Sequence, residues 1–354
     1  MLQKFLATGF AMSMFGGLAM AQDSTKTSAL AITGNADVYY RYDFAKKGNN
    51  LTSFTNSHNK FELGMASVKF DYKTSKVELV ADLGFGKRAE DFSYTSTGAT
   101  TAIKQLYISY SATSWLKFTA GSWATHVGYE LVDAPLNRNY SMSYMFTNGP
   151  FLHTGVKAEA TSGKSGFMIG ITNPTDYKYV PDGVMDKKFV IAQYSYAASD
   201  AFKLYLNYVG GQGTDTTKSN QFDVVVTSKL SDKFGLGFNG TLNSTKTYLG
   251  KDKFDDAKSW WGSALYVTFD PVSYFGLALR SEYFSDKNQL KYATGTANGA
   301  KIFATTLSAN FKVDNLTLIP EFRLDNASEQ IFSKSNGSAT KSAASFLIAA
   351  TYTF

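Results

Sequence analysis

The chain has three histidines, His58, His126 and His153, a residue type that often serves as a metal ligand, an acid or a base. None of them stands in an H-E-x-x-H pattern or has a second ligand at helical spacing, so zinc chemistry is unsupported. His126 and His153 bracket the longest loop that the sequence pattern predicts. Either a contact with a passing solute or a structural hydrogen bond would explain a histidine at these two positions.

Sequence patterns that would indicate an enzyme are absent or misplaced. Gly235, Gly237 and Gly240 spell G-x-G-x-x-G, but no helical pattern follows them, so we interpret them as small residues inside a strand that face a lumen. There is no G-x-S-x-G elbow, and no Ser, His and acidic residue stand out as a triad. The chain has no cysteine, which excludes thiolate metal sites and a thiol nucleophile. We therefore expect no catalytic residues, no cofactor and no metal.

Charged residues are spread over the whole chain. The formal net charge is +6, but the 35 Lys and Arg residues are scattered among 29 Asp and Glu residues. A nucleic-acid-binding chain would concentrate its positive charge in a patch or run, so we expect no nucleic acid partner. Instead, many charges alternate with apolar residues, as do Glu321, Arg323 and Asp325 with Phe322 and Leu324. A strand with one wet face would place such charges on one surface.

The elements that would position these charges are β-strands. Alternating segments recur along the chain from residue 30, and counting them gives about sixteen, each near the 9 to 11 residues that a tilted membrane-spanning strand needs. The second segment shifts its apolar parity between Met65 and Val68, which predicts a β-bulge. Seven short links alternate with eight long polar ones, at about 45–58, 87–100, 124–150, 173–188, 211–219, 246–258, 285–300 and 326–342.

A soluble sandwich would also alternate, but two features indicate a membrane barrel. The apolar face of the segments is almost free of charge, as lipid contact requires. Aromatic residues flank the short links, as in an interfacial girdle: Trp115, Phe167, Tyr196, Phe202, Phe234, Phe269, Phe275 and Phe311. We therefore predict an all-β fold, a transmembrane antiparallel up-and-down β-barrel of about 16 strands with both termini on the side of the short links.

The two ends of the chain are typical of an exported barrel. Lys4 precedes the apolar stretch 5–18, and Ala19-Met20-Ala21 has the form of a signal peptidase site, so we predict a cleavable signal peptide at 1–21 and a barrel at 22–354. The last strand alternates and ends in Phe354, which resembles the C-terminal signal of bacterial outer-membrane barrels. We expect the barrel-assembly machinery, outer-membrane lipid and lipopolysaccharide as partners, and the outer membrane of a Gram-negative bacterium as the location.

Several motifs between residues 77 and 175 resemble one known family. They are the Ala81–Gly86 run A-D-L-G-F-G, the following R-A-E-D-F, the stretch from Lys104 to Glu130 with G-S-W-A-T-H-V-G-Y-E, and N-R-N-Y-S-M-S-Y with the later G-P and H-T-G. This set is similar to the β-barrel porin-2 (OmpL-like) family. The resemblance implies an outer-membrane porin, a water-filled channel for passive diffusion of small hydrophilic solutes or ions. The resemblance identifies neither the solute nor any site residue of this chain.

The longest loop, 124–150, is the candidate for a constriction of such a channel. Its apolar residues Leu131, Val132, Met142, Met145 and Phe146 are unsuited to a freely solvated loop, and burial in the lumen would satisfy them. A lid over the rim, or a contact with a neighbouring subunit of a homotrimer, is the alternative. Our candidates for lining the pore or its constriction are Arg41, Asp82, Glu130, Asp133, Arg138, Lys157, Arg280, Glu282, Glu321 and Arg323.

Within this set we expect Glu130, Asp133 and Arg138 of the loop to face wall charges such as Arg280, Arg323 and Asp82. The alternatives to a passive porin are an enzyme built on an outer-membrane barrel, and a surface receptor or adhesin that acts through its loops. The sequence names neither the solute nor the preferred ion sign.

Overall fold

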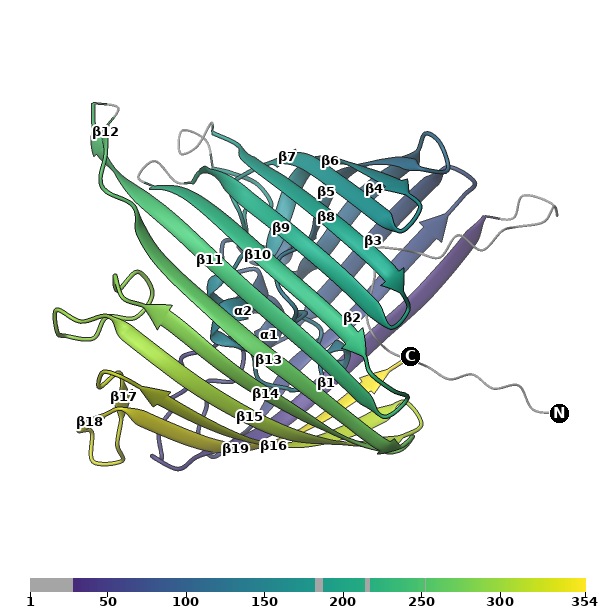
Figure 1. Cartoon of the computed structure of the whole chain (residues 1–354). Helices are drawn as coiled ribbons and strands as arrows, with labels where there is room; N and C mark the ends of the chain where they lie inside the picture. The colour runs from purple at the N-terminus through teal and green to yellow at the C-terminus, as the bar shows by residue number, and fades with distance from the viewer. Residues whose placement is uncertain (1–27, 182–186, 214–216, 252) are drawn as a thin grey trace.

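A computed structural model of the chain describes residues 28–181, 187–213, 217–251 and 253–354. The predicted signal peptide at 1–21 lies outside the described residues. Sixteen long strands form one closed antiparallel barrel (Figure 1). They are β1 (Ala29–Asp43), β2 (Lys60–Lys73), β3 (Val77–Phe85), β4 (Ile103–Ser111), β5 (Leu116–Ala124), β6 (Leu152–Ser162), β7 (Ser165–Thr172), β8 (Phe189–Ser199), β9 (Phe202–Gln212), β10 (Thr217–Lys229), β11 (Phe234–Gly250), β13 (Lys258–Val272), β14 (Phe275–Asp286), β15 (Ala300–Val313), β16 (Leu316–Ala327) and β19 (Ser342–Thr353).

Each long strand pairs with the next one along the chain, and β1 pairs with β19 to close the barrel. The remaining elements lie in the long loops: β12 (Lys253–Phe254), β17 (Phe332–Ser333), β18 (Ala339–Thr340), α1 (Lys87–Phe92), α2 (Tyr144–Asn148) and the 3-10 turns Gly98–Ala102 and Ala134–Leu136. The predicted all-β barrel is thereby confirmed. Among the residues that the structure describes, no helix is long and apolar enough to cross a membrane.

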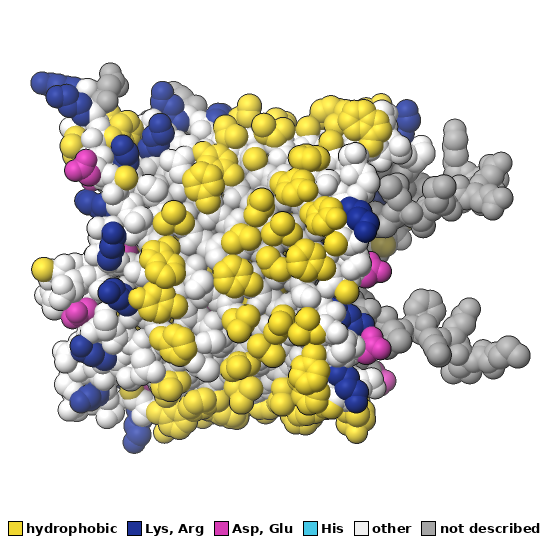
Figure 2. Space-filling model, in the orientation of Figure 1, with side chains coloured by type: hydrophobic (Ala, Val, Ile, Leu, Met, Phe, Trp, Pro, Cys, Tyr) yellow, Lys and Arg dark blue, Asp and Glu magenta, His cyan; other side chains and the backbone are white. Residues whose placement is uncertain are grey.

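The outer face of the barrel is apolar because one parity of each strand points outward. In β16, Leu318, Phe322 and Leu324 are exposed, whereas Glu321 and Arg323 between them are buried. Figure 2 shows the result, a broad band of hydrophobic side chains with lysine and acidic side chains gathered toward the two rims. Such a band is what a bilayer requires of a barrel wall.

The parity shift in β2 is a β-bulge. Ala36 of β1 pairs with Ala66, but Val38 pairs with Leu63, so β2 carries one residue more than its partner between these pairs. The extra residue turns Met65 inward, where it is 2% exposed, while Phe61 and Leu63 before the bulge point outward. The bulge therefore keeps the apolar residues on both sides of it on the outer face.

Candidate functional site

The loop between β5 and β6, residues 125–151, folds against the inner wall of the barrel; we call it the inserted loop. It contains α2, which Figure 1 shows enclosed by the strands. Tyr140, Met142 and Tyr144 of this loop are completely buried, and Val132, Met145 and Phe146 are nearly so. The apolar residues that are unsuited to a solvated loop are therefore packed away from water.

Two inward-facing glutamates of the wall hold the backbone of the inserted loop. Glu282 of β14 accepts hydrogen bonds from the N–H groups of Tyr144 (2.8 Å) and Met145 (2.9 Å), which begin α2. Glu321 of β16 accepts from the N–H groups of Tyr140 (2.7 Å) and Ser141 (3.1 Å). Because carboxylates accept strongly from backbone N–H groups, these bonds fix the path of residues 140–145 along β14 and β16.

Two wall arginines bind carbonyl groups of the same stretch. Arg280 of β14 donates to the Ser141 carbonyl oxygen (2.6 Å), and Arg323 of β16 donates to the Met142 carbonyl oxygen (2.7 Å). Arg323 also pairs with Asp325 on its own strand at 2.9 Å. The loop backbone is therefore bound through both its donors and its acceptors, so that wall charges replace the water it would otherwise need.

Two of the loop acids, Glu130 and Asp133, meet cations on the wall, and the partner of Asp133 lies outside the expected set. Glu130 pairs with Arg280, and its other oxygen accepts from the Ser143 N–H at 2.8 Å. Asp133 pairs with Lys104 of β4 at 2.6 Å, and the same ammonium group is 3.1 Å from Asp82 of β3. Lys104 thus joins the loop to the opposite side of the wall, and it was missing from our candidates.

The remaining candidates lie apart from this network. Arg138 does not meet Arg280, Arg323 or Asp82; its guanidinium binds Asp270, on β13 near a short turn, at 2.9 and 2.5 Å. Arg41 is held by Asp43 at 2.9 Å and by the Ser57 carbonyl. Lys157 of β6 pairs with Glu159 at 3.2 Å and lies over the ring of Trp123 at 5.1 Å.

The structure adds one buried cation that strand periodicity could not reveal. Arg88 belongs to α1 in the loop after β3, yet its guanidinium lies between the rings of Phe54 and Tyr140, 4.8 Å from each centroid. It also donates to the Val132 carbonyl oxygen at 3.3 Å. Arg88 therefore joins three long loops inside the barrel, and the R-A-E-D-F run that it begins did not indicate this position.

The two histidines at the base of the inserted loop make structural hydrogen bonds. His126 Nε2 is 3.2 Å from the Tyr208 carbonyl oxygen of β9, which only a protonated Nε2 can bond, and His153 Nε2 is 3.1 Å from the Thr125 hydroxyl. Both rings are buried, and their centroids are 5.2 Å apart. Burial lowers the pKa of His126 to about 4, so this ring is neutral at pH 7.

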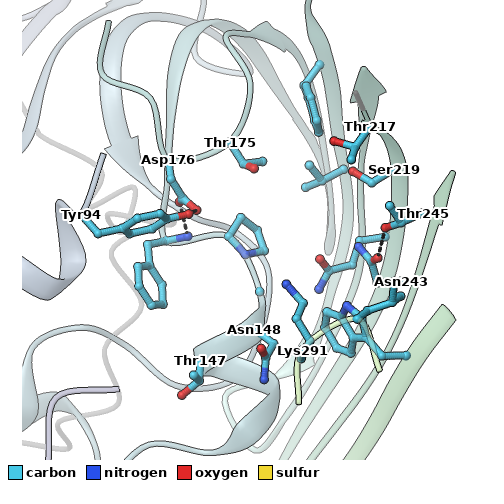
Figure 3. A pocket seen from close by; sticks show the side chains of 18 of the residues that line it. Tyr94, Thr147, Asn148, Thr175, Asp176, Thr217, Ser219, Asn243, Thr245 and Lys291 are labelled. Carbon is cyan, nitrogen blue, oxygen red and sulfur yellow. Dashed lines mark hydrogen bonds between the residues drawn. The ribbon is translucent and has the colours of Figure 1, made fainter. Parts of the chain in front are cut away.

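The inserted loop leaves a cavity of about 680 Å³ between its end and the walls β8–β13 (Figure 3). Residues 147–151 form one side, and hydroxyl and amide side chains of β10 and β11 form another. Tyr94 donates to Asp176 at 2.7 Å where the loops after β3 and β7 meet at its edge. A space of this size, lined by many polar groups, suits small hydrophilic molecules.

No group of three or more His, Cys, Asp or Glu side chains with metal-site geometry occurs among the described residues. The inward-facing acids Asp82, Glu282, Glu321 and Asp325 are instead paired with wall cations or bonded to the inserted loop. A barrel of 16 strands is wide enough for an aqueous channel, and here the inserted loop occupies part of that space.

Comparisons with known proteins agree with this architecture. The family model described as "Putative beta-barrel porin-2, OmpL-like" matches residues 29–354. The anion-selective porin from Comamonas acidovorans is 9% identical with a TM-score of 0.62, over 93% of this chain and 100% of that one. OmpT of Vibrio cholerae is 11% identical with a TM-score of 0.60, over 94% and 99%. OmpF of Salmonella typhi is 12% identical with a TM-score of 0.58, over 93% and 100%. No curated protein matches the chain.

Proposed function

The chain belongs to the β-barrel porin-2, OmpL-like family, and from that premise we propose that the inserted loop sets the width and the charge of its channel. The protein is a porin of the bacterial outer membrane, which passes small hydrophilic solutes or ions by passive diffusion. The constriction is formed by residues 130–145 together with the wall charges that hold them. The electric field in this constriction is set by charged side chains of the wall and of the loop: Arg280, Glu282, Glu321, Arg323, Asp82, Glu130 and Asp133.

One observation supports this role of the loop above all others. Five backbone N–H groups of the loop, those of Tyr140, Ser141, Ser143, Tyr144 and Met145, donate to the carboxylates of Glu321, Glu130 and Glu282. A loop that only covered the rim would have no need of inward-facing carboxylates from β14 and β16. Held in this way, the loop narrows the lumen without blocking it by a separate plug domain.

Single-channel recording tests the proposal. The purified protein is placed in a planar lipid bilayer, and we expect stepwise open-channel currents. The double variant Glu282→Ala, Glu321→Ala removes four of the backbone bonds, so we expect larger and noisier conductance steps. Asp232→Asn, in an exposed turn between β10 and β11, is the matched control and leaves the conductance unchanged. If the bilayer shows no current although the barrel is folded, the proposed channel is wrong. If the conductance of the double variant equals that of the wild type, the proposed constriction is wrong.

The same proposal includes a homotrimer. Phe61 and Leu63, just before the bulge in β2, are 88% and 75% exposed and give this part of the outer face a protruding apolar surface. The solved OmpT of Vibrio cholerae includes a trimer form, which supports the same assembly for a barrel of the same fold. Light scattering of the detergent-solubilised protein, corrected for bound detergent, tests it. A mass of one chain contradicts the trimer and leaves the channel untouched.

A further inference from the structure

The cavity beside the inserted loop contains a lysine, Lys291, that forms no ion pair or hydrogen bond through its ammonium group with any described residue. We propose that this cavity binds small hydroxylated carboxylates, with Lys291 as the partner of the carboxylate group. The proposal rests on the channel function proposed above, because it gives the class of solute that the half of the channel on the side of the long loops favours.

Of the residues in the described ranges, three charged ones line the cavity: Asp91, Asp176 and Lys291. Asp91 forms an ion pair with Lys87, one turn earlier in α1. Asp176 accepts from the N–H groups of Phe151 (2.6 Å) and Leu152 (3.0 Å) and from the Tyr94 hydroxyl. Each acid therefore already has its own partners. Burial raises the pKa of Asp176, and the nearby Lys291 attracts its carboxylate without forming an ion pair with it.

Lys291 is fixed at its backbone and free at its amine. Asp286, at the end of β14, accepts from the N–H groups of Leu290 (2.8 Å), Lys291 (2.7 Å) and Tyr292 (2.9 Å), which holds this turn in place. The ammonium group lies 5.8 Å from the ring centroid of Trp260. Within the described part of the chain it makes no hydrogen bond or ion pair, and the side chain is exposed to the cavity.

The β10–β11 side of the cavity offers neutral hydrogen-bonding groups. Thr217 and Ser219 of β10 make no side-chain hydrogen bond with any described residue. Asn243 of β11 accepts from Thr245 through its oxygen, at 2.8 Å, which leaves its N–H₂ group for other partners. Figure 3 shows these side chains and Lys291 lining the same space. A solute with a carboxylate at one end and hydroxyl groups along its length would satisfy both sides of the cavity.

Trp260 gives a direct readout because the Lys291 amine lies near its ring. Gluconate, glucose and glucosamine are the probes: they have similar size and hydroxyl content but are an anion, a neutral molecule and a cation at the pH chosen. We expect gluconate to change the Trp260 fluorescence in a saturable way. We also expect gluconate to bind at least about tenfold more tightly than glucose, because only gluconate forms a charge-assisted hydrogen bond with Lys291. Glucosamine should bind no better than glucose. The signal is assigned by its loss in Trp260→Phe.

Lys291→Met is the decisive variant, because it keeps the length and apolar stem of the side chain. We expect it to weaken gluconate binding about tenfold and to leave glucose unchanged. Lys287→Met, in the same loop at a position outside the cavity lining, is the matched control. Equal binding of gluconate and glucose, or no effect of Lys291→Met, overturns the site.

Gluconate added on one side of a bilayer separates the two proposals. We expect it to interrupt the open-channel current of the wild type and to do so far less in Lys291→Met. An open-channel current that gluconate does not change would agree with the channel function and refute the binding site. A fluorescence response without any channel would refute the proposed function and keep the site.

Discussion

Glu130 of the inserted loop and Arg280 of β14 form an ion pair in which both side chains are almost completely buried. The two residues are 150 positions apart in the chain. Arg280 binds the Ser141 carbonyl oxygen as well, and Glu130 binds the Ser143 N–H, so the pair connects the wall to two further points of the loop. This pair is therefore the point at which a change in one side chain would most directly free the loop.

We expect Arg280→Met to destabilise the protein by about 3 to 5 kcal/mol, because it leaves the Glu130 carboxylate buried without its partner. Chemical unfolding in lipid vesicles measures the loss. The double variant Glu130→Leu, Arg280→Met removes both charges and should recover most of it. If the double variant is as unstable as Arg280→Met alone, the cost comes from packing and not from an unpaired charge.

Closure of the barrel depends on a glycine opposite the C-terminal residue. The N–H and carbonyl groups of Gly34 in β1 pair with those of Phe354 at 3.0 Å each, and a Cβ at position 34 would lie 2.4 Å from the Phe354 ring. We expect Gly34→Val to slow assembly and to lower the yield of folded barrel on a heat-modifiability gel. Ala36→Val, two residues along the same outer face of β1, is the control, and equal loss in both variants would contradict this account.

The barrel and the outward-facing parity of its strands could be predicted from the sequence, since apolar residues alternate with polar ones along most of the strands. The bulge in β2 was visible as a parity shift at Met65. The partners of the loop charges were less accessible, because Arg138 meets Asp270 and Asp133 meets Lys104 through a loop path that no periodicity encodes. Arg88 was missed for the same reason. Lys291 lies in a loop with no apolar pattern, and only the cavity around it reveals its environment.

The outward parity makes a prediction about membrane insertion. Leu318 of β16 faces outward, so we expect Leu318→Arg to cost about 2 to 4 kcal/mol and to prevent stable insertion. Leu316→Arg, at the start of the same strand beside a short turn, lies near the interface and should cost about 0 to 1 kcal/mol. Membrane fractionation of the two variants compares them. Normal assembly of Leu318→Arg would show that this face does not contact lipid.

Arg138 links the loop to the wall near the short-turn side and contributes a positive charge there. Arg138→Glu places two acids together at Asp270, so we expect the reversal potential in a salt gradient to shift toward cations. The charge swap Arg138→Glu, Asp270→Arg restores the pair and should restore most of the original selectivity. If the ion selectivity of Arg138→Glu equals that of the wild type, the Arg138–Asp270 pair does not contribute to the charge of the constriction.

The histidine at the base of the inserted loop makes the loop sensitive to acid. Desolvation by burial is the main cause of the lowered pKa of His126, about 4 against an ordinary 6.5, and the nearby charge of Lys157 acts in the same direction. A loop released into water would bind a proton between these two values, whereas the packed loop would not. The contribution of His126 to the packing of the loop is therefore fully present above pH 6.5 and is lost as the pH falls toward 4, which costs about 3 kcal/mol at most.

Hydrogen exchange of residues 125–130 at pH 7 and pH 5 measures this effect. We expect faster exchange at pH 5 in the wild type, accompanied by noisier single-channel currents. The control is His126→Gln, whose amide can still donate to the Tyr208 carbonyl oxygen but does not titrate in this range. His153, whose ring centroid is 5.2 Å from that of His126, is kept in both proteins. If His126→Gln shows the same acid response, another group than His126 releases the loop.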